Sequence, residues 1–194
     1  GEYYAQVLRD QTFLRSLGVS LRIALLSAGF AAALGVLLAA ALVRLRKTSG
    51  PMLYLVRTPI LVPHAVVAVF AINLLSQAGL LARLAAALGL IAEQSEFPQL
   101  LFTPGYGGAI VAYLWKEIPF VAYFVLALMS SVSETLGEAA ENLGASPLRS
   151  FFSVTLPLTM PAILKAFLII FIFAFGGYEL PFLLGGTLPK ALPV

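Results

Sequence analysis

The sequence predicts an all-α integral membrane protein with about four transmembrane helices. Of its 194 residues 60% are hydrophobic and only 11% are charged, a composition that a water-soluble domain of this length would not tolerate. The apolar residues also gather into runs long enough to cross a bilayer, since about 20 helical residues span its hydrocarbon core. We expect the four spans at residues 17–43, 53–78, 106–129 and 162–186.

Composition also argues against several classes of site. The sequence has no cysteine and a single histidine, so neither a disulfide framework nor a zinc site is expected. No nucleophile and base stand in an arrangement that would make the chain an enzyme. The net charge of +3 is modest and gives no indication of nucleic-acid binding. We therefore expect no metal, no cofactor and no nucleic acid on this chain, and the lipid bilayer as its surroundings.

The first span follows an amphipathic stretch over residues 1–16. That stretch suits a helix at the membrane surface or a simple lead-in. Within 17–43, small residues recur at spacings of three, four and six, which favours close packing of another helix. These small residues are Gly18, Ala24, Ala28, Ala32, Gly35 and Ala39.

The loop over residues 44–51 sets the predicted orientation. It holds the densest basic segment of the chain, Arg44-Leu45-Arg46-Lys47, and short basic loops face the cytoplasm. By alternation, segment 79–105 lies outside and residues 133–160 lie in the cytoplasm. We expect a short amphipathic helix over 80–91 that does not cross the membrane.

Prolines shape the second span. Pro59 and Pro63 lie near the cytoplasmic start of 53–78 and free backbone carbonyls there, which predicts a bend or a broken first turn. His64 follows, and we expect it to be a packing or interfacial residue rather than a functional one.

The third span carries two adjacent charges. Lys116 and Glu117 lie within 106–129, shortly before Pro119. Charges inside a membrane are costly and usually face a cavity or one another. A role in the solute path and mutual neutralisation therefore both stay open.

Paired glycines interrupt the fourth span. Within 162–186, Gly176-Gly177 precede Tyr178, Glu179 and a proline. This pattern predicts that the helix loosens here and exposes backbone groups. Glu179 is a candidate for the solute path together with Tyr178. The alternative for Glu179 is a structural ion pair with a basic residue on a neighbouring helix.

Residues 133–160 form a moderately polar segment between the last two spans. Ser133 stands where a hydroxyl caps a helix. Three carboxylates then follow at spacings that place them on one helix face: Glu134, Glu138 and Glu141. Gly144 is expected to end this helix, and Ser146-Pro147 to begin another at a new angle.

The same segment carries a longer pattern. Glu138-Ala139-Ala140 is followed, after three residues, by Gly144 and, after nine more, by Val154-Thr155-Leu156-Pro157. This spacing resembles the EAA loop of the membrane subunits of binding-protein-dependent ATP-binding-cassette (ABC) importers, with Val154 where isoleucine is usual. The resemblance implies that 133–160 is a coupling loop that sits in a cleft of a cytoplasmic ATPase. The residues it assigns to coupling are Glu138, Ala139, Ala140, Gly144, Ala145, Leu156 and Pro157.

The resemblance covers most of the chain. It implies the type I ABC importer permease (MetI-like) helix bundle, with residues 1–194 as a single permease domain. This family usually has six spans, so we expect the sequence to be a fragment that lacks the first and the last. Segment 175–186, Phe-Gly-Gly-Tyr-Glu-Leu-Pro-Phe-Leu-Leu-Gly-Gly, looks most like permeases of the spermidine and putrescine branch.

Function and partners are implied by the same resemblance. It suggests a multi-pass permease subunit of a bacterial inner membrane that forms the path of a small solute, with a polyamine as the expected cargo. Its implied partners are a second permease, identical or homologous, a periplasmic or surface solute-binding protein, and cytoplasmic ATPase subunits that hold the ATP and Mg²⁺. The chain has no phosphate-binding loop of its own.

Two other classes of protein remain as alternatives. A secondary, ATP-independent transporter would also carry buried charges, but it would have no reason for the coupling loop. A structural or assembly membrane protein would explain the packing helices, but it would leave the intramembrane carboxylate idle.

Overall fold

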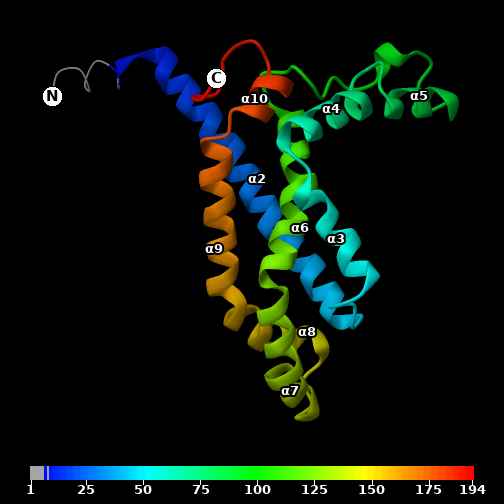
Figure 1. Ribbon diagram of the computed structural model, residues 1–194, viewed down its shortest axis with the longest axis vertical. Helices are drawn as coiled ribbons and strands as arrows, with labels where there is room; N and C mark the ends of the chain where they lie inside the picture. Colours follow the sequence, from blue (N-terminus) through cyan, green and yellow to red (C-terminus); the bar gives the residue numbers. More distant parts are fainter. Residues whose placement is uncertain (1–6, 8) are drawn as a thin grey trace. The chain divides into compact units, whose positions relative to one another are not determined.

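The computed structural model describes residue 7 and residues 9–194, and the regular structure of this part of the chain is entirely helical (Figure 1). Within it, four helical stretches are long and apolar enough to cross a membrane. The predicted all-α class with four candidate spans is confirmed. The stretches are Gln11–Arg44, His64–Ala87, Gly107–Asn142 and Pro147–Phe175. Of the amphipathic stretch 1–16, predicted as a surface helix or a simple lead-in, residues 1–6 and 8 lie outside the described residues, and residues 11–16 form the start of the first long helix.

The chain forms two compact units that alternate along it. The first comprises Val62–Leu114, Phe171–Val194 and the described residues up to Ser27. The second comprises Ala28–Leu61 and Trp115–Ile170.

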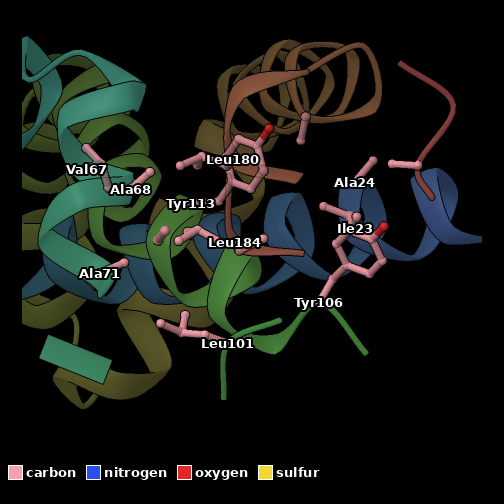
Figure 2. Packing of buried hydrophobic residues seen from close by; sticks show 14 residues of the cluster. Ile23, Ala24, Val67, Ala68, Ala71, Leu101, Tyr106, Tyr113, Leu180 and Leu184 are labelled. Atoms are coloured by element: carbon pink, nitrogen blue, oxygen red, sulfur yellow. The ribbon is translucent and has the colours of Figure 1, made fainter. Parts of the chain in front are cut away.

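The first unit has a core made largely of alanine and larger aliphatic side chains, together with Tyr106 and Tyr113 (Figure 2). It draws on the start of helix α2 (Gln11–Arg44), on α4 (His64–Leu75), on the start of α6 (Gly107–Val132) and on α10 (Glu179–Leu184). Alanines on α2, α4 and α6 let the helices approach closely, and α10 packs against α4. The Tyr106 hydroxyl donates a hydrogen bond to the Pro189 carbonyl at 2.9 Å, which ties the C-terminal segment to this core.

In the second unit, α2 and α6 approach at a glycine. A Cβ built on Gly35 would lie 2.5 Å from the Cβ of Val121 and 2.8 Å from the Ile118 carbonyl oxygen. Neither atom is a flexible side-chain end, so only glycine fits. The predicted packing face of α2 is therefore confirmed at Gly35 and at the fully buried Ala24, Ala28 and Ala39. Gly18 is exposed and Ala32 is only half-buried.

The second predicted span, 53–78, is interrupted near its prolines, where the sequence predicts a bend or a broken first turn. The structure has two helices, α3 (Pro51–Leu61) and α4, with a break at Val62 and Pro63. Helix α3 ends before Pro63 because proline has no backbone donor and disfavours helical conformation in the residue before it. Pro63 itself is extended, with φ −60° and ψ 145°, and precedes the first residue of α4. The apolar stretch long enough to cross a membrane begins at His64 and includes α5 (Leu80–Ala87). A short 3₁₀ turn, η1 (Gln94–Glu96), follows.

The fourth predicted span, 162–186, has different ends. Helix α9 (Leu156–Phe175) starts earlier and stops at the paired glycines, and α10 begins only after Tyr178. The break itself is where the glycines predict it. The first and third predicted spans, 17–43 and 106–129, lie within longer helical stretches.

Candidate functional site

The polar segment 133–160 is a helical hairpin (Figure 1). Helix α6 runs without interruption into a π-helical turn, η2 (Ser133–Gly137), and then into α7 (Glu138–Asn142). After a turn, α8 (Pro147–Ser150) and a second π turn, η3 (Phe151–Thr155), lead into α9. The prediction that Ser133 caps a new helix is wrong, because Val132 is already helical and no residue before it breaks α6.

Gly144 ends α7, as predicted. Its φ is +93°, a left-handed conformation that costs glycine nothing and other L-residues about 1–2 kcal/mol. The Gly144 N–H donates to the Glu141 carbonyl and the Ala145 N–H to the Ala140 carbonyl, both at 3.0 Å. This pair of bonds is a Schellman motif, and it satisfies carbonyls that the helix end leaves open.

Ser146 and Pro147 begin α8, also as predicted. The Ser146 side chain accepts a hydrogen bond from the Arg149 N–H at 3.3 Å, and Pro147 occupies the first helical turn, where its missing donor is not needed. The tight turn between α7 and α8 is therefore built by residues of the turn itself.

A cluster of hydroxyl groups joins the two arms of the hairpin around Gly137. The buried Ser150 hydroxyl donates to the Gly137 carbonyl at 3.0 Å. A Cβ on Gly137 would lie 3.4 Å from the Ser150 oxygen and 3.5 Å from those of Ser133 and Thr155. We call these four residues the Gly137 joint. The sequence does not reveal this joint, because isolated serines and threonines carry no pattern that shows which other segment they contact.

The tip of the hairpin exposes large apolar side chains. Leu143 is 90% exposed and Leu148 is 72% exposed, on either side of the Gly144 turn. Exposed apolar side chains that are grouped in this way mark a protein or membrane contact. Among the residues assigned to coupling, Glu138, Ala139 and Gly144 lie on this exposed part of the hairpin.

The other coupling residues lie at its base or are partly covered. Ala140, Ala145 and Leu156 are half-buried, and Pro157 is exposed at the start of α9. The seven assigned residues therefore belong to one helical hairpin, but they do not share one surface.

Two arginines contact the carboxylates of the hairpin. Arg44 lies 3.9 Å from Glu141 and Arg46 lies 3.8 Å from Glu138. Both ion pairs are solvent-exposed, so each stabilises the structure by about 1 kcal/mol or less. Glu134 is engaged separately and accepts a hydrogen bond from Ser130 at 2.8 Å.

A cavity beside these residues belongs to the same unit. It measures about 700 Å³, and its lining includes Arg57, Tyr123 and Glu134. The Arg57 guanidinium lies over the Tyr123 ring, 4.1 Å from its centroid, and also donates to the Tyr123 hydroxyl. This pair joins α3 to α6 across a long separation in the chain, so no local pattern in the sequence indicates it.

The first unit holds a second cavity, of about 650 Å³, at the break between α9 and α10. Tyr178 and Glu179, the candidates for the solute path on this segment, both line it. His64 lines it too, with its ring centroid 5.0 Å from that of Phe173 and 5.9 Å from that of Tyr113. His64 thus packs against aromatic rings, as predicted, but it also faces a cavity that the sequence did not reveal.

The glycine break is required by its surroundings. A Cβ on Gly177 would lie 2.3 Å from the Tyr113 hydroxyl and 3.0 Å from the Phe173 carbonyl oxygen. Because Tyr113 is only 1% exposed, its ring has little room to move away. Tyr113 is thus a cavity residue that no motif in the sequence indicates.

Lys116 and Glu117 belong to the second unit, on α6. Glu117 is 8% exposed, whereas Lys116 is half-buried. Consecutive residues of an α-helix point roughly 100° apart, so this geometry does not favour mutual neutralisation. Neither residue lines either of the two cavities described above.

Comparison with known families decides the class of protein. The family described as "binding-protein-dependent transport system inner membrane component" matches residues 31–191, well over half of the chain. The chain belongs to this family. Its predicted location in the inner membrane and its predicted class, a transport component and not an enzyme, are confirmed by that membership.

Individual permeases of this family show the extent of the match. The chain is 29% identical to the putrescine transport system permease protein PotI of Escherichia coli over 99% of the chain and 63% of PotI. It is 34% identical to the trehalose transport system permease protein SugA of Mycobacterium tuberculosis over 94% of the chain and 58% of SugA. The sn-glycerol-3-phosphate transport system permease protein UgpA of Yersinia pestis is 30% identical over 89% of the chain and 57% of UgpA.

These permeases leave the solute open. The chain spans less than two thirds of the length of each of them. Their names refer to three different solutes: putrescine, trehalose and sn-glycerol-3-phosphate. A diamine, a neutral sugar and an organic phosphate have no charge in common, so the similarity to inner membrane components does not specify a cargo.

A solved structure shows the same fold. A chain of a bacterial ABC transporter involved in the import of the acidic polysaccharide alginate matches with a TM-score of 0.78, covering 99% of this chain and 69% of that one at 22% identity. The predicted type I importer permease fold is confirmed.

Proposed function

We propose that this chain acts in a permease subunit of an ATP-driven ABC importer. In this proposal it forms part of a solute path across the inner membrane and couples to a cytoplasmic ATPase through the hairpin at residues 133–160. Family membership over residues 31–191 supports the general role.

The observation that carries the coupling role is the exposed tip of the hairpin. Leu143 and Leu148 flank a turn that Gly144 and Ser146 hold by their own hydrogen bonds. A self-supporting apolar tip suits insertion into a cleft of a partner, because little ordering entropy is lost when it docks. The spacing from Glu138 to Pro157 supports the ATPase as that partner.

The Gly137 joint connects this tip to the membrane helices. Ser150 of α8 bonds to the Gly137 carbonyl at the end of η2, so the two arms of the hairpin are linked at their base. A displacement of the tip by the ATPase would therefore move α6 and α9 at their cytoplasmic ends. Glu138 contacts Arg46 of the basic loop, and Leu156 and Pro157 lie in the first turn of α9.

The solute path is assigned to charged and aromatic residues inside the apolar stretches. We place Tyr178 and Glu179 on the path because they line a cavity at a broken helix. Lys116 and Glu117 are assigned to the path or its gate, since an intramembrane charge is a functional candidate. The cargo is a small solute, with a polyamine favoured by the two glutamates and by segment 175–186.

The complete importer requires further subunits. We propose a second permease, identical or homologous, ATPase subunits that hold the ATP and Mg²⁺, and a periplasmic or surface solute-binding protein. The binding protein delivers the cargo, and ATP-driven closure of the ATPases moves the two coupling hairpins together.

Co-purification of the full-length permease with its genomically neighbouring ATPase tests this proposal. The change Leu143→Asp places a charge at the exposed tip and is expected to reduce ATPase retention at least tenfold, since hot-spot apolar residues typically contribute about 2 kcal/mol or more. Leu90→Asp is the matched control, because Leu90 is 74% exposed in the first unit and lies outside the hairpin.

The outcome is read from retention and from ATP turnover stimulated by candidate binding proteins. Loss of the ATPase with Leu143→Asp but not with Leu90→Asp supports the coupling hairpin. If the wild-type permease retains no ATPase, or both changes are silent, the importer assignment fails and a secondary transporter becomes the better account.

A further inference from the structure

We propose that the cavity between α3 and α6 binds the headgroup of a zwitterionic phospholipid that carries a primary ammonium group. Loop 44–51, α3, α6 and η2 all contribute to its lining, within the second unit. Its volume of about 700 Å³ lies within the range of about 300–1,000 Å³ typical of small-molecule sites. None of the residues assigned to the solute path lines this cavity, so the inference does not depend on the cargo.

The lining carries one fixed charge of each sign. Among the described residues that form it, Arg57 is the only basic one and Glu134 the only acidic one. A simple anion would be attracted by Arg57 but repelled by Glu134, and a simple amine would meet the reverse. A headgroup that holds a phosphate and an ammonium group a few bonds apart satisfies both charges at once.

Arg57 is oriented by Tyr123. Its guanidinium lies over the Tyr123 ring, 4.1 Å from the centroid, and one of its N–H groups donates to the Tyr123 hydroxyl. A guanidinium has five N–H donors in one plane, so this contact leaves donors that can bind two phosphate oxygens side by side. Because the ring already restrains this half-buried side chain, less rotamer freedom is lost when a ligand binds.

Glu134 suits the ammonium half of the headgroup. The Ser130 hydroxyl donates to one Glu134 oxygen at 2.8 Å, and a carboxylate has further lone pairs that can accept from an ammonium group. A primary ammonium offers three N–H donors, whereas the quaternary ammonium of choline offers none. The carboxylate therefore favours an ethanolamine headgroup over a choline headgroup. Thr48 and Ser131 add hydroxyls to the lining, and hydroxyls can donate to phosphate oxygens.

The flank of the cavity favours a lipid over a soluble ligand. Leu53 lines the cavity, and the structure shows every residue of α3 as exposed or half-buried. Tyr54 and Leu55 follow Leu53 and are 68% and 69% exposed, so acyl chains have apolar side chains to pack against next to the headgroup. Because loop 44–51 is basic and predicted to be cytoplasmic, the lipid belongs to the cytoplasmic leaflet.

Native mass spectrometry of the full-length permease, titrated with three dioleoyl phospholipids, tests the site. The lipids carry phosphoethanolamine, phosphocholine or phosphoglycerol headgroups on the same acyl chains. We expect the ethanolamine lipid to bind about three- to tenfold more tightly than either of the others. Hydrogen bonds between charged groups are the stronger ones, but Glu134 is exposed to water, which reduces their contribution.

Single variants separate the two charges. Arg57→Gln should weaken binding of all three lipids about three- to tenfold, because each of them has a phosphate. Glu134→Gln should remove the preference for the ethanolamine lipid over the choline lipid. Lys47→Gln is the control, since Lys47 is an exposed cation of the same basic loop that does not line the cavity. It should change the affinities by about twofold or less, because salt screens an exposed charge.

A second titration separates a lipid from a soluble ligand. Glycerophosphoethanolamine has the same headgroup without acyl chains, and it should compete poorly with the ethanolamine lipid. Competition at equal concentration would overturn the assignment to a lipid. Thermal unfolding of each variant shows whether it is folded, so that a loss of binding reports on the site.

Other results would also overturn the proposal. These are equal affinities for the three lipids, tighter binding of the phosphoglycerol lipid, no binding of any of them, or an unchanged preference in a folded Glu134→Gln variant. ATPase retention, measured on the same preparations, reports separately on the proposed function. A permease that prefers the ethanolamine lipid but retains no ATPase would refute the importer role and leave the lipid site in place.

Discussion

At the scale of single residues, backbone geometry and buried hydroxyls explain the hairpin at 133–160. Gly144 adopts a left-handed conformation with no atom within 4 Å of where a Cβ would be. The requirement there is conformational and not one of space. Ser150 differs from Gly144, because its backbone is helical. Its contribution to the hairpin is the buried hydrogen bond from its hydroxyl to the Gly137 carbonyl.

Gly144 variants should rank by their tolerance of the left-handed region. Gly144→Asn should keep most uptake, since asparagine adopts this conformation readily, whereas Gly144→Val should lose most of it because a β-branched residue is strained there by about 1–2 kcal/mol or more. Uptake per ATP hydrolysed, measured in proteoliposomes, checks the ranking. Equal activity of the two variants would show that the left-handed turn is not needed.

Ser150→Ala should loosen the Gly137 joint. It removes the donor to the Gly137 carbonyl and leaves that acceptor without this bond, at a cost of about 1–3 kcal/mol. We expect a lower midpoint of thermal unfolding and less solute moved per ATP. Ser153→Ala is the control, because Ser153 is exposed on the same arm. An unchanged transport ratio in Ser150→Ala would remove the joint from the coupling mechanism.

At the scale of elements, breaks in helices position the candidate sites. Pro63 separates α3 from α4, and Gly176 and Gly177 separate α9 from α10. Each break has a local backbone cause, and each lies beside the aromatic cavity of the first unit. Tyr113 makes glycine necessary at position 177, within the second break, because its hydroxyl occupies the space that a side chain there would need.

Gly177→Ala should therefore disturb α10, and removal of the Tyr113 hydroxyl should relieve part of the effect. We expect Gly177→Ala to lower uptake several-fold and Gly177→Ala with Tyr113→Phe to recover part of it, with a coupling energy of about 0.5–3 kcal/mol. A double-mutant cycle on uptake and on thermal unfolding measures this energy. Strict additivity of the two changes would contradict the contact.

At the scale of the whole molecule, the distribution of charge orients the chain. The basic loop at 44–51 pairs with Glu138 and Glu141 of the hairpin, so two segments predicted to be cytoplasmic are in contact. The predicted orientation thus agrees with a contact that was not used to derive it.

Cysteine accessibility tests this orientation, since residues 1–194 contain no cysteine. In a full-length protein with any other cysteines replaced, Ser49→Cys and Ser153→Cys should react with a membrane-impermeant maleimide only in inside-out vesicles. Ser95→Cys should react from the outside of intact spheroplasts. Labelling of Ser49→Cys and Ser95→Cys from the same side would overturn the predicted topology.

The sequence by itself determined the class, the breaks and the coupling spacing of this protein. Composition alone indicates membrane helices, and proline or glycine acts on the backbone where it stands, so Pro63, Gly144 and Gly177 were recognisable without a structure. Only the tertiary structure decided that Ser150 meets Gly137, that Arg57 lies over Tyr123, and that His64 and Tyr113 share a cavity with Glu179. These contacts join residues far apart in the chain, and local periodicity carries no information about which helix faces will meet.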